Sequence, residues 1–484
     1  MMSESGSAPE TIGEAPGGPV GASQAQTSAT AVHKPAIIGV FARRVGSVLA
    51  TQVTLFVIAF ATSILLSRLL GPDGKGAYVA VVTLPGMLAA VGMFGLPGAA
   101  NYFAGCGASL KSLIRAAYLF TAVLSVVLVG VVWFSLPVLE SSILRAAPEN
   151  LVKVVLLTVP FGILASFGGS ILYGRQAVRV YNLIQIVLAA VSLAAVVVLV
   201  GALRFGVNGA VAGSVLVGVL MAAAVMIAAT RLGGASPGGT PASLGELASY
   251  GARLYPSSLT GFFHYRADTY IIQALMLNAS AALGLYSMAV TMDELVFYIP
   301  DSVTTIFLPR VAGSTAEESN RLVGRVGRLT TLLTVAVALC LIPAAFVGIH
   351  LILPKFVDCL TAFVVLLPGV VSLSVAKVMT SYVNGRGHPG LVAIGTVTSL
   401  VLNVILNVIF IPRFGIVGAS LSSLISYTFQ AGMAVVFASR LSGQSPLALF
   451  VPGSAEVGLL VETGRRLLGR ALAGRLGFVV GGKR

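Results

Sequence analysis

The sequence predicts an all-α integral membrane protein with about twelve transmembrane helices, arranged as two six-helix lobes. The first observation behind this prediction is composition: 57% of the 484 residues are hydrophobic, only 10% are charged, and the mean hydropathy is +0.97. A soluble domain carries about 25% charged residues. The 55 glycines also fit a membrane protein, because small residues let membrane helices pack closely.

The second observation is a series of apolar runs, each about 20 residues long, the length that a helix needs to cross the hydrocarbon core. Lys34, Arg43 and Arg44 flank the first run, and polar or glycine-rich segments separate the others. The predicted spans are 46–69, 77–100, 113–134, 152–173, 181–203, 209–230, 255–277, 283–307, 329–350, 361–383, 390–411 and 418–439.

The third observation is an internal repeat. Three short motifs recur about 210 residues later, each at an equivalent loop: Gly76-Ala-Tyr as Gly284-Leu-Tyr, Gly174-Arg as Gly385-Arg, and Arg204-Phe-Gly-Val-Asn-Gly-Ala as Arg413-Phe-Gly-Ile-Val-Gly-Ala. A unit with six spans, used twice, gives two parallel copies related by an axis along the membrane normal. Chance similarity between glycine-rich loops is the alternative interpretation.

Basic residues predict the orientation. If the N-terminus is cytoplasmic, the loops on the inside carry roughly three times as many Lys and Arg residues as those on the outside. In this count Lys75 belongs to an outside loop. This bias favours cytoplasmic N- and C-termini. The net charge of +14 then reflects membrane topology, and nucleic-acid binding is not expected.

These patterns divide the chain into five parts. The first part is rich in Ser, Gly, Ala, Pro and Thr without Lys or Arg, which predicts disorder and not a signal peptide. The last part alternates Leu with Arg and Glu over 455–476, which predicts a surface anchor on the inner leaflet, with partner binding as the alternative. The predicted order is a disordered cytoplasmic tail (1–33), a first six-helix lobe (34–230), a Gly- and Pro-rich cytoplasmic linker (231–254), a second six-helix lobe (255–440) and a cytoplasmic basic amphipathic tail (441–484).

Motifs of enzyme chemistry are missing from the sequence. We find no nucleophile elbow, no phosphate-binding glycine loop in a strand–helix context and no metal-ligand spacing. The four histidines are far apart in sequence, and Cys106, Cys340 and Cys359 are scattered. We therefore expect a protein that is not an enzyme and that uses no metal or cofactor.

Ionisable residues within the predicted spans are the strongest functional signal. A charge at membrane depth costs about 2.5–3.5 kcal/mol, so such residues face a partner or a water-filled cavity. We predict a polar cavity in which cations neutralise an anionic ligand and carboxylates bind and release a cation. Ion pairs that only hold the second lobe together, such as Arg266 with Asp293, are the alternative. The candidate substrate-binding residues are Arg266, Lys377, Gln52 and Asn101, and the candidate cation-coupling residues are Asp268, Asp293 and Glu294.

Three stretches between about 45 and 440 carry a family resemblance. The first is SRLLGPDGKGAYVAVVTLPGMLAAVGMFGLPGA (67–99). The second is YRADTYIIQALMLNASAALGLYSMAVTMDELVFYIPDSVTTIFLPRVA (265–312), and the third combines YVNGRGHPGLVAI with RFGIVGASLSS. In this order they resemble the polysaccharide-biosynthesis, or oligosaccharide flippase, family of the multidrug/oligosaccharidyl-lipid/polysaccharide (MOP) exporter superfamily.

The resemblance implies two six-helix lobes in a V. It also implies a flippase that moves a lipid-linked oligosaccharide, typically on undecaprenyl diphosphate, across the cytoplasmic membrane by alternating access, driven by a cation or substrate gradient. Asp268 and Glu294 match family motif positions, whereas Arg266 and Lys377 match none that we can assert. The first span lacks the buried arginines of peptidoglycan-precursor flippases, and two C-terminal spans of those proteins are missing, which disfavours lipid II as substrate. The expected partners are the lipid-linked oligosaccharide, membrane lipids, H⁺ or Na⁺ as coupling ion, and glycan assembly proteins.

Three other classes of function stay open at the sequence level. A cation-coupled antiporter of cationic drugs or metabolites on the same fold would need an acidic, aromatic cavity and no Arg266. A membrane enzyme such as a glycan polymerase would need a large external loop, and the predicted outside loops are short. A scaffold would act through the tails 1–33 and 441–484.

Overall fold

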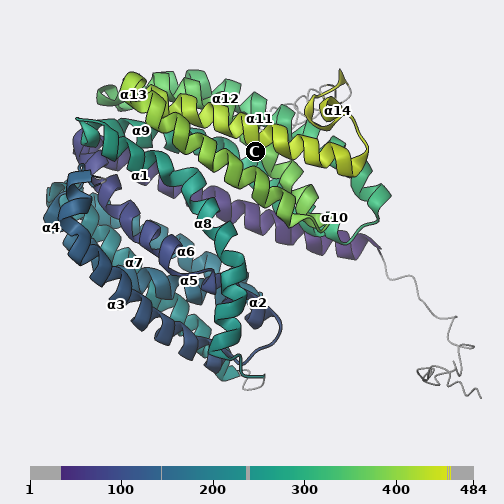
Figure 1. Cartoon of the computed structure of the whole chain (residues 1–484), viewed down its shortest axis with the longest axis horizontal. Coiled ribbons are helices and arrows are strands. Elements are labelled where there is room, and N and C mark those ends of the chain that lie inside the picture. Colours follow the sequence, from purple (N-terminus) through teal and green to yellow (C-terminus); the bar gives the residue numbers. More distant parts are fainter. Residues whose placement is uncertain (1–33, 143, 236–239, 455, 457, 459–484) are drawn as a thin grey trace, which may run out of the picture. The chain divides into compact units, whose positions relative to one another are not determined.

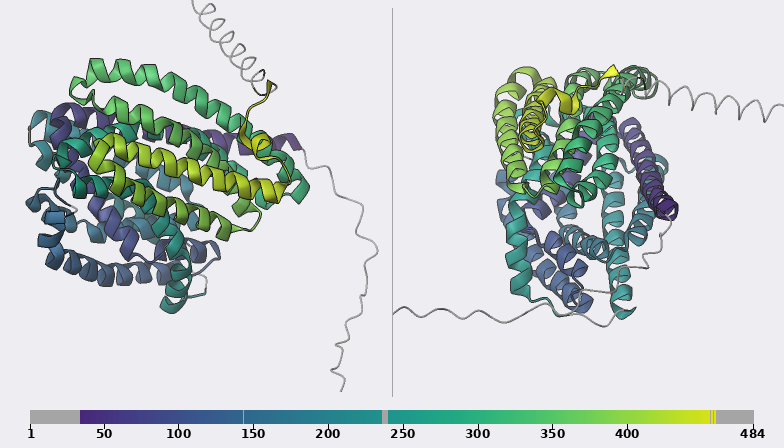
Figure 2. Two further views of the ribbon diagram at one scale, coloured as in Figure 1. Left: turned by 45° about the horizontal axis from the view of Figure 1, so that its top comes forward. Right: turned by 90° about the vertical axis from the view of Figure 1, so that its right-hand side faces the viewer.

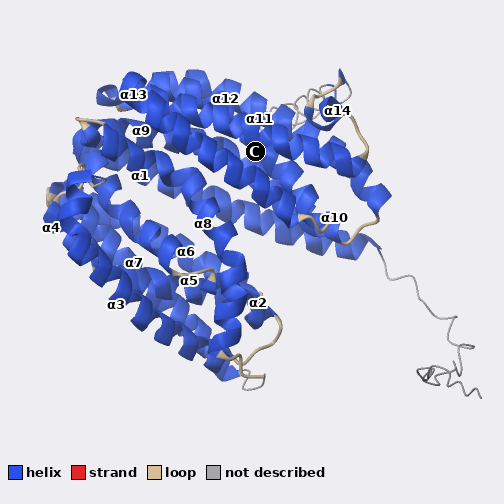
Figure 3. Ribbon diagram, in the orientation of Figure 1, coloured by secondary structure: helices blue, strands red, loops and turns tan. Residues whose placement is uncertain are grey.

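The computed structural model describes residues 34–142, 144–235, 240–454, 456 and 458. Every regular element in this part of the chain is a helix (Figure 3), which confirms the all-α prediction. The predicted tail 1–33 and most of the predicted amphipathic helix after 455 lie outside the described residues. The elements, labelled as in Figure 1, are α1 (Lys34–Gly92), α2 (Leu96–Gly105), α3 (Leu110–Ser142), α4 (Glu149–Leu156), α5 (Val159–Gly174), α6 (Val178–Ala195), the π-helix η1 (Val196–Ala202), α7 (Gly206–Ala235), α8 (Leu244–Leu275), α9 (Ala279–Asp293), the 3₁₀ turn η2 (Glu294–Phe297), α10 (Tyr298–Ala312), α11 (Ala316–Ile352), the 3₁₀ turn η3 (Pro354–Phe356), α12 (Cys359–Gly385), α13 (Pro389–Ser442) and α14 (Pro446–Phe450).

Membrane-spanning helices dominate the described chain. Eight candidate spans are long and apolar enough to cross a bilayer, or nine if the bent pair α4–α5 forms one span. The protein is therefore a multi-pass membrane protein, while the number twelve stays a prediction. Two of the eight, Thr51–Gly92 and Pro389–Ser442, are 42 and 54 residues long, and each contains one non-helical glycine, Gly71 and Gly415 respectively. α8 is not among the eight because its sequence is more polar.

The internal repeat is visible in the backbone. Gly206 and Gly415, the third residues of the two Arg-Phe-Gly motifs, have φ angles of 57° and 58°. Gln176 and Gly387, which follow the two Gly-Arg motifs, have φ angles of 58° and 82°. Since positive φ is uncommon outside glycine, finding it at two matched pairs of positions shows that the halves use the same turns.

The segment 231–254, predicted as a linker, is largely helical. α7 continues to Ala235 and α8 already begins at Leu244. A capping box explains the early start of α8: Ser243 Oγ accepts from the Glu246 amide (3.1 Å), and Glu246 Oε2 accepts from the Ser243 amide (2.8 Å). The loop predicted from the glycine and proline content was therefore longer than the connection between α7 and α8 in the structure.

Two large hydrophobic cores hold the helices together. One is built from residues between 81 and 247, and the other mainly from residues between 272 and 449. In the second core, α12 packs against α10, α11 and α13, which run beside it in both views of Figure 2. Phe363 and Tyr382 of α12 are fully buried. α12 is therefore the central helix of the second half.

The two halves meet at a pair of repeat-related glycines. A Cβ atom on Gly76 would overlap the backbone carbonyl of Ser280, and a Cβ atom on Gly284 would overlap that of Pro72. Gly284 corresponds to Gly76 in the repeat, so each half offers the other the same surface. α1 and α9 touch backbone to backbone here because neither glycine has a side chain.

Candidate functional site

A cavity of about 540 Å³, here called the main cavity, lies beside this glycine contact. α1 and α6 of the first half and α8, α9 and η2 of the second half line it. Its wall combines apolar side chains with hydroxyl groups and three charges. The polar and charged lining residues are Thr62, Ser63, Lys75, Tyr78, Thr83, Ser192, Tyr265, Arg266, Thr269, Tyr286, Ser287, Thr291 and Glu294.

Lys75 is the most buried charge in the main cavity, with 4% of the residue exposed. Its Nζ donates to Ser67 Oγ (2.8 Å) and Ser63 Oγ (3.1 Å), and lies 3.3 Å from Met288 Sδ and 5.6 Å from the centroid of the Phe356 ring. None of the ion pairs in the described part of the chain includes it. A buried charge without a counter-ion is costly, so an anionic ligand in this cavity would be attracted to Lys75.

Lys75 was predicted to lie in an outside loop, and the loop position was wrong. The helical path resumes at Pro72, directly after the non-helical Gly71. Proline is well accommodated in a first helical turn, where its missing amide is not needed. Lys75 therefore lies on a helix and is buried, so it does not count as a topology-setting loop charge.

Arg266 and Glu294 form an ion pair in the main cavity. Arg266 Nη2 lies 3.8 Å from Glu294 Oε1, and the two side chains are 42% and 44% exposed. An ion pair at this exposure contributes at most about 1 kcal/mol, so both groups stay available to a ligand. The alternative pair of Arg266 with Asp293 is not formed.

Asp268 is buried in the second half and held by three donors. Tyr286 Oη (2.5 Å) and Ser423 Oγ (2.8 Å) donate to its Oδ2, and Asn407 Nδ2 donates to its Oδ1 (2.5 Å). Asn407 Nδ2 also donates to Asn403 Oδ1 (2.9 Å), which extends the network along α13. Because Tyr286 also lines the main cavity, the carboxylate is one hydrogen bond away from it.

The internal repeat indicates that Asp268 has a role beyond the folding of the second half. Tyr78 and Ser214 are the first-half counterparts of Tyr286 and Ser423 by sequence spacing, and their hydroxyl oxygens lie 2.8 Å apart. No carboxylate takes part in the hydrogen bonds described for this first pair. The same tyrosine–serine arrangement thus packs without an acid, which favours a functional role for Asp268.

Two further buried side chains, both ionisable, have no hydrogen-bond partner among the described residues. Both carboxylate oxygens of Asp293, at the end of α9, are unpartnered, and the residue is 1% exposed. Both ring nitrogens of His264 are unpartnered too, and its ring lies 5.1 Å from that of Tyr427. Neither residue lines the main cavity, whereas Glu294 does.

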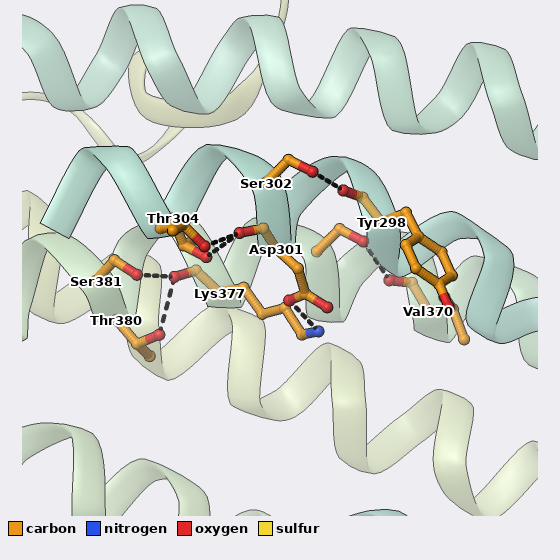
Figure 4. Close-up of polar contacts among 10 residues, drawn as sticks. Tyr298, Asp301, Ser302, Thr304, Val370, Lys377, Thr380 and Ser381 are labelled. Carbon is orange, nitrogen blue, oxygen red and sulfur yellow. Dashed lines mark hydrogen bonds and ion pairs between the residues drawn. The ribbon is translucent and has the colours of Figure 1, made fainter. Parts of the chain in front are cut away.

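Lys377 does not line the main cavity itself, but its Nζ lies 6.0 Å from the ring centroid of Tyr265, which does. Its Nζ donates to Asp301 Oδ1 (2.6 Å), as Figure 4 shows, and lies 4.0 Å from the centroid of the Phe297 ring. The ammonium group is thus satisfied by a carboxylate and an aromatic face. The structure brings Lys377 together with Asp301 rather than with Arg266.

The two first-half candidates also lie outside the main cavity. Gln52 is exposed on α1, and Asn101 is exposed on α2. The backbone carbonyl of Asn101 faces Gly174 of α5, where a Cβ atom would overlap it. Of the seven predicted site residues, Arg266 and Glu294 line the main cavity, and Asp268 reaches it through Tyr286.

Sequence reasoning missed Lys75, Tyr286, Ser423 and the two asparagines. A signal for the asparagines was present: Asn403 and Asn407 are four apart in an otherwise apolar span, so they share one helix face. No comparable signal marked Lys75, because only the helix start at Pro72 turns it inward.

Three solved membrane transporters have folds similar to this chain. The inward closed conformation of the lipid II flippase MurJ aligns with a TM-score of 0.65 at 12% identity, over 80% of this chain and 86% of that one. An inward-facing multidrug resistance MATE family transporter of the MOP superfamily aligns with a TM-score of 0.56 at 17% identity, over 81% and 94%. The eukaryotic MATE transporter AtDTX14 gives a TM-score of 0.57 at 13% identity, over 82% and 96%. At these identities the likeness establishes the fold.

Sequence comparison establishes the family. The probable low-salt glycan biosynthesis flippase Agl15 of Haloferax volcanii is 27% identical over 192 residues, which span 38% of this chain and only 39% of that relative. A family model described as polysaccharide biosynthesis protein matches residues 65–361. The chain therefore belongs to the polysaccharide biosynthesis protein family and has the fold of MOP superfamily transporters.

Proposed function

We propose that this protein is a flippase, not an enzyme, and that it moves a lipid-linked oligosaccharide across the cytoplasmic membrane for polysaccharide biosynthesis. The observation that carries the proposal is the charge of the main cavity. Lys75 and Arg266 line it together with one carboxylate, Glu294, which already faces Arg266. Lys75 is left without a counter-ion among the described residues.

The physical task explains this charge. A diphosphate carrying sugars cannot enter hydrocarbon alone, because its polar groups would lose water without new partners. In a polar cavity between the two halves, hydroxyl groups and cations replace that water, while the lipid tail stays in the bilayer. An undecaprenyl-diphosphate-type carrier fits this arrangement, with Lys75 and Arg266 binding phosphate oxygens through charge-assisted hydrogen bonds.

Cation coupling is the second part of the proposal, and Asp268 is its centre. A proton or sodium ion bound at this carboxylate would change the hydrogen bond from Tyr286, which lines the main cavity. The ion can drive transport only if it binds the inward and outward arrangements with different affinity. Glu294 and the unpartnered Asp293 are the other candidate coupling groups.

Alternating access would use the two halves as units, with lobes at about 34–230 and 255–440 and both termini in the cytoplasm. The contact between Gly76 and Gly284 would close one end of the main cavity. Rocking about the repeat axis would separate these glycines and open the cavity on that side. Glycan assembly proteins would supply and take up the substrate.

Purified protein in liposomes tests the proposal with a fluorescent undecaprenyl-diphosphate oligosaccharide, whose exposed fraction is read with an impermeant quencher. We expect translocation that falls at least about tenfold in Lys75→Gln, since a charged hydrogen bond contributes about 1.5–3 kcal/mol. Lys153→Gln, which removes an exposed cation of α4, serves as the control. If the protein moved cationic dyes but not the lipid, the flippase proposal would be wrong and a drug antiporter would be the better assignment.

A further inference from the structure

A second cavity, of about 500 Å³, lies between α3 and α7. Lys111, Arg115 and Tyr118 line it from α3, where spacings of four and three residues place them on one helix face. Thr230 and Gly233 line it from α7. None of its lining residues belongs to the main cavity, so it is a separate feature of the first half.

Gly233 lines this groove at a close approach of the two helices. A Cβ atom there would lie 3.2 Å from the Cβ atom of Leu110, which is tighter than ordinary contact. α3 and α7 approach each other closely at this point because the side chain is missing. The groove is therefore lined by two closely packed helices.

The groove carries positive charge with no negative charge to balance it. Lys111 and Arg115 are exposed, and neither takes part in an ion pair among the described residues. Arg231 adds a third exposed cation next to Thr230. The following acidic residue, Glu246, accepts a hydrogen bond from the Ser243 amide in the capping box of α8.

The position on the helix strengthens the attraction for an anion. Lys111 and Arg115 occupy the first two turns of α3, which begins at Leu110. Cations are unfavourable at a helix N-terminus, because the aligned peptide dipoles leave partial positive charge there. An anion bound between the two side chains would be stabilised by both the cations and the helix end.

The other wall of the groove leads onto a lipid-facing surface. On α3, Leu119, Val123 and Val126 are 46%, 55% and 75% exposed, and Ile227 of α7 is 51% exposed. α3 and α7 are both candidate membrane spans, so these side chains face acyl chains. Tyr118, itself 50% exposed, lies between the charged end and this apolar surface, as expected for an interfacial tyrosine.

We propose that this groove binds an anionic phospholipid, with Lys111 and Arg115 on the phosphate and Tyr118 at the boundary with the acyl chains. A free phosphate ion would use the cations but not the apolar wall. A soluble acidic protein would likewise use the cations but not the apolar surface that continues from the groove along α3 and α7. Basic grooves between membrane helices are a recurrent solution for anionic head groups.

The test measures binding of phosphatidylglycerol to the purified full-length protein in detergent, with phosphatidylcholine as reference, by native mass spectrometry. Each cation near a membrane surface contributes about 1 kcal/mol, so Lys111→Gln/Arg115→Gln should weaken binding about fivefold per charge and about 25-fold in total. The matched control is Arg325→Gln/Arg440→Gln, which removes two exposed cations elsewhere on the chain. Equal losses in both double variants would show general charge attraction and overturn the proposal.

A third variant distinguishes binding in the groove from attraction to a charged surface. Thr230→Trp keeps Lys111 and Arg115 but fills the groove from an exposed position, so it should abolish selective binding with unchanged net charge. Retained binding in Thr230→Trp would contradict the proposal. Displacement of the lipid by millimolar inorganic phosphate would also contradict it, because it would mean that the apolar wall contributes nothing.

Discussion

The contact between Gly76 and Gly284 allows a quantitative prediction about the closed end of the main cavity. In Gly76→Ala, the new methyl group would overlap the backbone carbonyl of Ser280. A helix backbone cannot turn aside as a flexible side chain can, so α1 and α9 must separate. Overpacking of this size costs about 1–3 kcal/mol. The closed contact should therefore be about 5- to 150-fold less populated relative to open arrangements.

The symmetry of the contact sharpens this prediction. Gly284→Ala should have the same effect, because its methyl group would overlap Pro72 in the same way. Once one methyl group has separated the helices, the second meets less resistance, so the double variant should cost less than the sum of the two. Alanine also favours helices over glycine by up to about 1 kcal/mol. Gly130→Ala on α3, where a Cβ atom meets nothing within 4 Å, controls for that gain.

Spin labels measure the separation. Cysteines introduced at Arg68, which precedes the break of α1 at Gly71, and at Leu277, which precedes α9, are both at exposed positions and would report the distance after Cys106 and Cys340 are replaced by serine. We expect a longer distance in Gly76→Ala and an unchanged one in the control. An unchanged distance distribution in Gly76→Ala, or strict additivity in the double variant, would refute the reasoning.

Three further predictions concern single side chains. Asp268→Asn puts an amide opposite the Nδ2 donor of Asn407, so cation-dependent transport should be abolished at normal membrane abundance; cation-dependent export from this variant would exclude Asp268 as the coupling site. Arg266→Ala should abolish glycan export while Lys377→Ala, whose partner is Asp301, should reduce export less; equal loss in a cellular export assay would contradict the cavity assignment. At the C-terminal segment, the hydrogen bond from Arg328 Nε (2.6 Å) holds the pKa of Glu456 below its usual value. Its stabilisation is fully present above the unfolded pKa, about 4.3, and is lost as the pH falls through the lowered folded value. The protection of the α14 amides from hydrogen exchange, expressed relative to the intrinsic exchange rate at each pH, should therefore fall in acid, and the same fall in Glu456→Gln would show that this contact is not its cause.

Features that depend on local composition could be predicted from the sequence. Apolar runs predicted the membrane helices, because length and hydropathy alone decide which segments cross a bilayer. The repeated Arg-Phe-Gly motif predicted the duplication, and its glycines adopt the same left-handed turn in both halves. Arg266 and Glu294 were found because a charge in an apolar helix is conspicuous.

Features that depend on distant contacts could not be predicted in this way. The partners of Asp268 include Asn407 and Ser423, which are 139 and 155 residues away in sequence. Lys75 resembled a loop charge until the helix beginning at Pro72 placed it inside. The contact of Lys377 with Asp301 was not predicted, because sequence depth alone does not tell which helix lies opposite. Gln52 and Asn101 are polar residues in helices that are otherwise largely apolar, and burial distinguishes such residues only in the folded chain.

The central claim is that the main cavity binds an anionic head group through Lys75. The most direct measurement compares the affinity of the purified protein for undecaprenyl diphosphate and for undecaprenol, which has the same tail and no phosphate. We predict that the wild-type protein prefers the diphosphate, and that this preference falls at least about tenfold in Lys75→Gln but not in Lys153→Gln. Equal affinity for the two lipids in the wild-type protein, or an unchanged preference in Lys75→Gln, would contradict the account.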